Sequence, residues 1–130
     1  MKNKKIAILG DSPLKYDARV QRIIKSFEGK GFNVDVFLPN VNITELNLFN
    51  DKVKFYYYEM KNSWLKRNIF FWRKYAKVIE LVNSKKVKYG YIYINDYPLL
   101  DSGCKIKEHL NSILIYDCHE IYIETINQFF

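Results

Sequence analysis

The chain has 130 residues, and its 21 Lys and Arg against 14 Asp and Glu give a formal net charge of +7. Apolar residues make up 48% of the chain, whereas Gly and Pro are few, at 5 and 3. This composition excludes a disordered, collagen-like or linker-rich protein, and the length predicts a single domain over residues 1–130. The positive charge leaves phosphate-bearing ligands, anionic membranes and nucleic acid open as partners.

Cysteine usage and hydropathy predict a cytoplasmic protein. Cys104 and Cys118 are too few for the disulfide framework of a small secreted domain, and we expect Cys118 to be a small buried apolar side chain. The apolar run at residues 6–9 is too short for a signal peptide. No segment approaches the roughly 18 apolar residues that a membrane span needs.

The first forty residues predict a strand, a helix and a second strand. Residues 6–9 form a short, continuously apolar run that is typical of a buried strand. Behind Asp17, a suitable N-cap, apolar residues recur at helical spacing as far as Gly29 and Gly31, which predict the end of the helix. Residues 32–38 are rich in strand-forming residues, so the three elements predict a βαβ unit with a parallel sheet.

The alternation continues to the end of the chain. After a loop at 41–51, the pattern predicts strands at 53–60, 89–95 and 112–117 and helices at 65–84 and 98–110. We therefore expect an α/β fold, a three-layer Rossmann-like sandwich with a mostly parallel sheet. In such sheets the ligand site lies beyond the carboxyl ends of the strands, which selects residues 10–17, 95–98 and 117–120.

The first of these segments holds Asp11, Ser12 and Asp17, and Arg19 follows it. It lacks the G-x-G-x-x-G pattern that holds a dinucleotide pyrophosphate. Asp17 is equally suited to cap the following helix and to serve in a site. Because a cation in the first helical turn opposes the helix dipole, Arg19 should have an anionic partner. That partner is either Asp11 or Asp17, or a phosphate or carboxylate of a ligand.

The other two segments carry carboxylates and a histidine. Asp96 either caps the helix that opens at residues 97–98 or accepts hydrogen bonds from sugar hydroxyls, and capping is slightly favoured for this residue alone. Asp117 and His119 share one side if their strand continues. His119 would then be an acid–base group or a donor to a sugar or phosphate, although a lone His is more often structural. Together with Glu120 these residues lack an established metal-ligand spacing, so no metal is expected.

Three motifs in register carry a resemblance. They are Asp17-x-Arg19-Val20, the run at 96–100 (Asp-Tyr-Pro-Leu-Leu) and the run at 116–124 (Tyr-Asp-Cys-His-Glu-x-Tyr-x-Glu). In order and spacing, over almost the whole chain, they resemble the amino-terminal half of GT-B glycosyltransferases. The similarity is to glycosyltransferase family 4, retaining enzymes that transfer a sugar from a nucleotide-sugar donor.

This resemblance implies two Rossmann-like domains that face each other across a cleft. The amino-terminal domain would bind the acceptor, and the carboxy-terminal domain, absent here, would bind the nucleotide-diphosphate sugar with no further cofactor. His119 matches a family histidine that contacts the transferred sugar. The remaining matched positions would line the acceptor side (Asp17, Arg19, Asp96) or support it (Asp11, Ser12, Asp117, Glu120). Residues 10–13 depart from the family's glycine-rich turn, and without the second domain we do not expect the chain to be active alone.

Residues 63–86 combine aromatic side chains with basic ones. A core helix with a solvated basic face is favoured, and the alternative is a peripheral contact with an anionic membrane at the inner face of the cell membrane. Nucleic-acid binding is not expected, because no known binding module is present and the aromatics fall at core spacing. The expected function is the acceptor-binding domain of a glycosyltransferase that acts on a saccharide or lipid-linked acceptor. The alternative is a free-standing, non-catalytic binding domain of the same fold.

Overall fold

The computed structural model describes residues 3–43, 48–59 and 76–118. The strands are β1 (Lys5–Leu9), β2 (Asn33–Pro39), β3 (Val53–Tyr58), β4 (Tyr91–Ile94) and β5 (Ile113–Tyr116). The α-helices are α1 (Ala18–Gly29), α4 (Ala76–Ser84) and α5 (Leu100–Leu110), and two 3-10 turns, η1 (Leu14–Tyr16) and η2 (Tyr97–Leu99), were not predicted. Every strand that the sequence pattern predicted is present. The predicted helix at 65–84 is described only from residue 76 onward.

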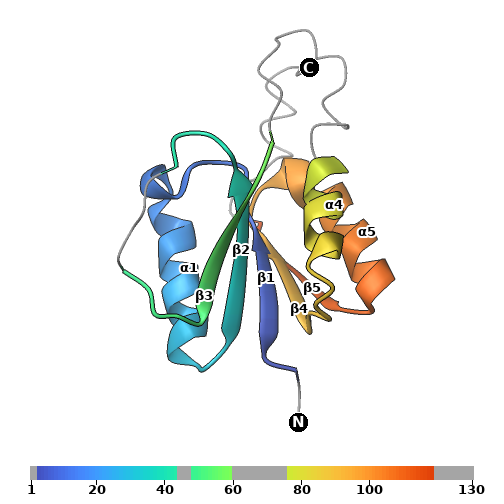
Figure 1. Cartoon of the computed structure of the whole chain (residues 1–130), viewed down its shortest axis with the longest axis horizontal. Coiled ribbons are helices and arrows are strands. Elements are labelled where there is room, and N and C mark those ends of the chain that lie inside the picture. Colours follow the sequence, from blue (N-terminus) through green and yellow to red (C-terminus); the bar gives the residue numbers. More distant parts are fainter. Residues whose placement is uncertain (1–2, 44–47, 60–75, 119–130) are drawn as a thin grey trace, which may run out of the picture.

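The five strands form one sheet in the order β3-β2-β1-β4-β5, and every neighbouring pair is parallel. Helix α1 covers one face, and α4 and α5 cover the other (Figure 1). This arrangement confirms the predicted three-layer Rossmann-like α/β sandwich. The chain builds outward from β1 to β3 and then returns to the other side of β1, so the switch point of the sheet lies between β1 and β4.

Strand β1 is the centre of the core, and its residues Ile6, Ala7, Ile8 and Leu9 have no exposed surface. Ile6 and Ile8 pack with the α1 side, whereas Ala7 and Leu9 pack with the side that holds α4 and α5. Burial on both faces explains why the strand is continuously apolar rather than alternating.

Helix α5 lies unusually close to β4 at Gly103. A Cβ atom at this position would meet the Ile94 Cδ1 atom at 2.0 Å. Any larger residue here would therefore force the Ile94 side chain to move, which glycine avoids. At the far end of α1, Gly31 has a φ of 83°, which terminates the helix as predicted.

The structure describes both cysteines of the chain. Neither Cys104 nor Cys118 forms a disulfide. Cys118 is exposed, so the prediction of a buried side chain is wrong; it follows β5, an edge strand whose residues are only partly covered. Within residues 3–43, 48–59 and 76–118, no helix combines the length and the hydropathy that crossing a membrane requires.

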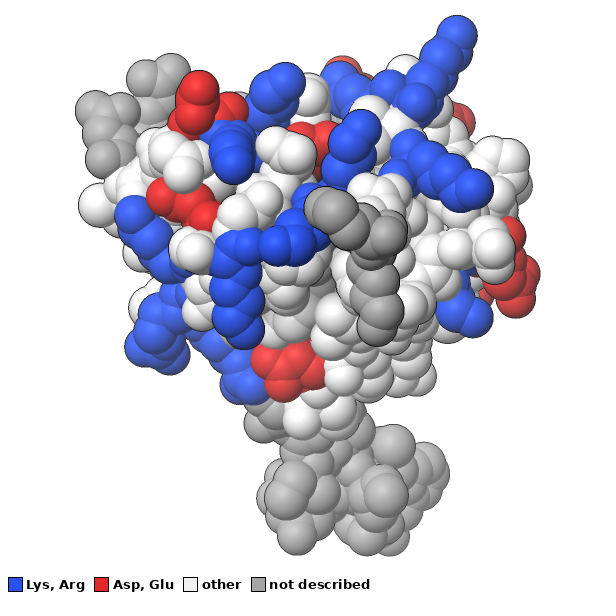
Figure 2. Space-filling view, turned by 90° about the horizontal axis from the view of Figure 1, so that it is seen from below, with Lys and Arg blue, Asp and Glu red and all other residues white. Residues whose placement is uncertain are grey.

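Charged side chains are distributed unevenly over the domain. Figure 2 views the end where the strands begin, which we call the amino edge, and Lys and Arg side chains gather there. The opposite end, where the strands finish, is called the carboxyl edge. It holds the segments that the sequence selected as a site.

Candidate functional site

The sheet register brings the selected segments together at the carboxyl edge. Leu9 pairs with Ile94, and Ile94 pairs with Tyr116, so β1, β4 and β5 end side by side. The residues that follow these strands therefore lie around the switch point, where open parallel sheets bind their ligands. Of the predicted site residues, the structure describes Asp11, Ser12, Asp17, Arg19, Asp96 and Asp117.

A hydrogen bond joins the loops after β1 and β4. The Asp11 backbone N–H donates to Asp96 Oδ2 at 3.0 Å. Asp96 occupies the N-cap position of η2, but its side chain makes no capping bond, and its backbone carbonyl closes the turn with the Leu99 N–H at 3.0 Å. Asp96 thus takes the N-cap position that was favoured, but its carboxylate does not cap the turn and bridges the switch point instead.

Asp17 serves as the cap of α1. Its Oδ1 accepts from the Val20 N–H at 3.1 Å, as the sequence predicted, and its Oδ2 lies 3.2 Å from the Ser12 hydroxyl. Both carboxylate oxygens are thus engaged close to the start of the helix. This explains why Asp17 is not the partner of Arg19.

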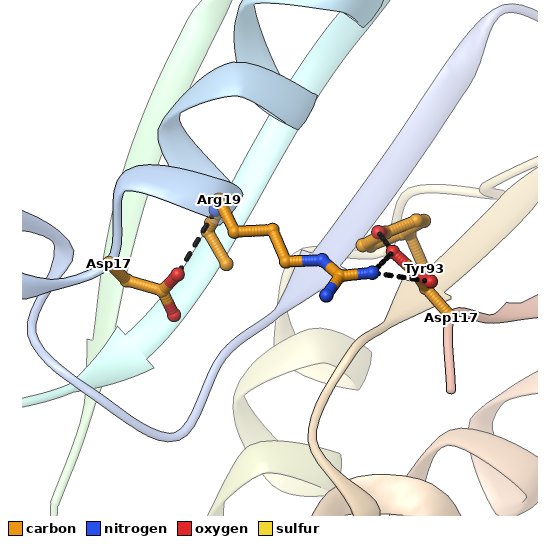
Figure 3. A network of polar contacts seen from close by, with 5 residues as sticks. Asp17, Arg19, Tyr93 and Asp117 are labelled. Atoms are coloured by element: carbon orange, nitrogen blue, oxygen red, sulfur yellow. Dashed lines mark hydrogen bonds and ion pairs between the residues drawn. The ribbon is translucent and has the colours of Figure 1, made fainter. Parts of the chain in front are cut away.

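Arg19 extends from the first turn of α1 toward the end of β5 (Figure 3). One terminal nitrogen of its guanidinium lies 2.9 Å and 3.0 Å from the two carboxylate oxygens of Asp117. The expected anionic partner exists, but it is neither Asp11 nor Asp17. The two side chains are 38% and 31% exposed, so solvent screens the pair only in part.

Tyr93 completes this cluster from β4. Its hydroxyl donates to Asp117 Oδ2 at 2.7 Å, and only 4% of the residue is exposed. Burial raises the pKa of Tyr93 well above its ordinary value of 10.0, and the hydrogen bond to Asp117 raises it further. The phenol therefore stays neutral and acts as a fixed donor. Sequence analysis missed Tyr93, although a tyrosine inside a buried strand signals that its hydroxyl needs a partner.

Asn95, directly after β4, is the second residue that sequence analysis missed. It is 2% exposed, and its Oδ1 has no hydrogen-bond partner within the part of the chain that the structure describes. Because Ile94 pairs with Tyr116, Asn95 lies next to Asp117 in register. A buried acceptor without a donor costs about 1–3 kcal/mol. Since Asn95 directly follows β4 at the switch point, its amide is a candidate contact for a ligand.

The structure does not describe the remaining predicted site residues. His119 and Glu120 lie outside the described residues, as does most of the aromatic segment at 63–86. Among the described residues, no group of three or more His, Cys, Asp or Glu side chains is placed to hold a metal ion. The described part of the polar cluster at the carboxyl edge contains carboxylates, a guanidinium, a phenol, an amide and the Ser12 hydroxyl. These groups suit hydrogen bonding to a ligand rich in hydroxyls.

Comparison with known proteins adds no family: no family model and no curated protein matches the chain.

Proposed function

We propose that the chain is the amino-terminal, acceptor-binding domain of a glycosyltransferase. The observation that carries the proposal is the polar cluster at the switch point, which includes the buried Asn95, whose Oδ1 has no partner among the described residues. It is supported by the all-parallel sheet and by the three motifs whose described residues converge there.

The hydroxyl groups of a sugar would complement the polar side chains of the carboxyl edge. Each sugar hydroxyl donates one hydrogen bond and accepts others. Carboxylates such as Asp96 and the amide of Asn95 accept from hydroxyls, and Arg19, whose position Asp117 fixes, donates to them. The Tyr93 hydroxyl gives its one proton to Asp117, so its oxygen can only accept from a sugar. Fixed polar groups select a hydroxyl pattern because an unmatched buried group is costly.

The transfer itself would need residues beyond this cluster. We propose that His119 faces the transferred sugar, that Glu120 supports it, and that a second domain binds the nucleotide-diphosphate sugar. The chain by itself would then bind acceptor without transferring sugar. We further propose a cytoplasmic location, peripheral at the inner face of the membrane where the acceptor is lipid-linked.

Saccharide binding by the full chain tests the proposal. A glycan array identifies a bound saccharide, and titration calorimetry then compares the wild type with Asp96→Asn. Asparagine still accepts from the Asp11 N–H but removes the charge, so we expect roughly tenfold weaker binding with an intact fold. Glu80→Gln, which neutralises a 69% exposed side chain on α4, is the matched control and should bind like the wild type.

Three outcomes contradict the proposal. They are no binding to any glycan, equal binding by Asp96→Asn and the wild type, and transfer of sugar by the chain alone. Binding of a non-saccharide ligand at this edge would favour the alternative, a free-standing binding domain without catalysis.

A further inference from the structure

Basic side chains, blue in Figure 2, outnumber the acidic ones at the amino edge of the sheet. The lysines come from the start of β1, the end of α1, the start of β3, the segment between α4 and β4, and the last turn of α5. We call them the amino-edge lysines: Lys4, Lys5, Lys30, Lys52, Lys54, Lys85, Lys86, Lys88 and Lys107. All are exposed except Lys85, which is partly covered.

Helix dipoles explain only some of these positions. A cation is favourable at the carboxyl end of a helix, which accounts for Lys30, for Lys85 and Lys86, and for Lys107. The others precede or begin strands, and strand ends carry no comparable dipole. The local backbone therefore does not favour a cation at the five remaining positions, which are Lys4, Lys5, Lys52, Lys54 and Lys88.

Ion pairing does not explain them either. Across residues 3–43, 48–59 and 76–118, every salt bridge that joins two described side chains lies elsewhere. Lys4 instead contacts the Lys30 carbonyl, and Lys85 lies 3.9 Å from the ring centre of Tyr56. Among the described side chains, none of the amino-edge lysines is therefore held in a salt bridge.

The chemistry of this edge favours a membrane over nucleic acid. Its cations are all lysines, whereas the described arginines, Arg19 and Arg22, lie in the first turns of α1. Lysine ammonium groups are point charges without the fork that arginine offers to phosphates and bases. Moreover, the exposed large apolar residue at this edge is Ile113, 55% exposed at the start of β5, and an aliphatic side chain cannot stack on a base.

A cavity of about 370 Å³ opens between some of these lysines. Lys5, Lys52 and Lys54 line it together with Asp35 and Asp51, and the Tyr89 hydroxyl donates to Asp35 at 2.5 Å. The lining carries both signs of charge with an excess of one positive charge. This matches a phospholipid headgroup that carries both signs with a net negative charge.

From these observations we propose that the amino edge docks on an anionic membrane surface, with the amino-edge lysines over the headgroups and Ile113 at the interface. Each lysine near such a surface contributes roughly the same favourable increment, and salt screens it. The proposed function includes a peripheral location at the membrane, and the amino edge is the surface that would make this contact. Docking is tested by membrane binding alone and does not depend on saccharide binding.

Docking in this orientation has a consequence for the acceptor. Strand β2 has seven residues, which at about 3.3 Å each separate the two edges of the sheet by roughly 20 Å. The carboxyl edge would therefore face away from the bilayer. A saccharide extending into water would reach it, whereas a sugar held at headgroup level would not.

Vesicle co-sedimentation of the full chain tests the docking surface. We expect binding to phosphatidylcholine vesicles that contain phosphatidylglycerol or phosphatidylserine, no binding to pure phosphatidylcholine, and loss of binding at high salt. The triple variant Lys52→Gln/Lys86→Gln/Lys88→Gln should bind roughly 100-fold more weakly, or about 2.8 kcal/mol at about 1.4 kcal/mol per tenfold. The control Lys15→Gln/Lys77→Gln/Lys105→Gln removes the same charge away from this edge and should bind nearly as the wild type does.

Specific results overturn the inference. Equal weakening in the two triple variants would show that only net charge matters. Failure to bind anionic vesicles at low salt would exclude the membrane, and binding to nucleic acid in its place would assign the lysines to that partner. None of these results depends on saccharide binding, so this inference and the proposed function fail separately.

Discussion

The two edges of the sheet use charge in different ways. At the carboxyl edge, Arg19, Asp117 and Tyr93 are joined by hydrogen bonds between 2.7 Å and 3.0 Å, and Asp96 joins two loops. At the amino edge, every lysine except Lys85 is exposed, and none forms a salt bridge with a described side chain. Paired charges have fixed positions, which a small ligand with directional hydrogen bonds requires. Exposed charges of one sign attract a broad surface without fixing its position.

The difference also concerns stability. Charges that are paired and partly buried contribute to the fold through hydrogen bonds to ionised groups. Charges that are exposed and alike contribute little or repel each other. The net charge of +7 therefore does not describe a uniformly basic protein. The following predictions test this contrast from the largest expected effect to the smallest.

Asp117→Ala should produce the largest loss. The substitution removes the acceptor of Arg19 and leaves the nearly buried Tyr93 hydroxyl without a partner. We expect the free energy of unfolding to fall by about 2–3 kcal/mol, measured by urea denaturation at neutral pH. Glu80→Ala is the control, because the Glu80–Lys77 pair is largely exposed and its loss should cost about 0.5 kcal/mol or less. Equal losses in the two variants would mean that the carboxyl-edge network does not hold in solution.

Tyr93→Phe should cost about 1–2 kcal/mol at neutral pH, since one hydrogen bond to a charged acceptor is lost. The cost should depend on pH in a defined direction. Below pH 10.0, tyrosine is neutral in both folded and unfolded chains. Above pH 10.0, the tyrosine of the unfolded wild type releases its proton, whereas folded Tyr93 keeps it because its pKa is raised. The free energy of unfolding of the wild type therefore falls with rising pH, and Tyr93→Phe lacks this contribution. Unfolding measured across alkaline pH should show the gap closing, and a constant gap would contradict the buried neutral phenol.

Asn95→Leu separates stability from binding at the same edge. Leucine of similar size removes the buried Oδ1 that has no described partner, so the free energy of unfolding should stay unchanged or rise by about 1 kcal/mol. Saccharide binding should fall at least about tenfold, since a ligand hydroxyl loses its acceptor. Denaturation and calorimetry on one preparation measure both quantities. A clear loss of stability would mean that Asn95 serves the fold rather than a ligand.

Patterns that arise from local spacing were predictable. Continuous apolar runs gave the buried strands, and the Asp17 cap followed from its place before a helical stripe. The edge of the sheet that holds the polar cluster followed from the alternation of strands and helices, because parallel strands end at one edge. The partners within the cluster did not follow. Arg19 and Asp117 are separated by 98 positions, and only the strand order decides that α1 reaches the end of β5.

The directions of side chains were the second feature that could not be predicted from the sequence. Asp96 has the sequence of a helix cap, yet the proximity of β1 turns its carboxylate toward the Asp11 N–H. Likewise, the sequence shows many lysines but not that they gather at one edge, because their positions along the chain are far apart. Both features depend on packing between distant segments, which spacing along the chain does not encode.

The smallest effect is expected at the amino edge itself. Lys52→Gln/Lys86→Gln/Lys88→Gln should raise the free energy of unfolding by about 0.5 kcal/mol or less at low salt, because it removes repulsion and breaks no described salt bridge. The control Lys77→Gln/Lys105→Gln breaks the pairs with Glu80 and Asp101, and should lower the same quantity by about 0.3–0.5 kcal/mol per pair. High salt should erase both changes. If the amino-edge variant instead lost more than about 1 kcal/mol, these lysines would hold the fold together, and the contrast between the two edges would not stand.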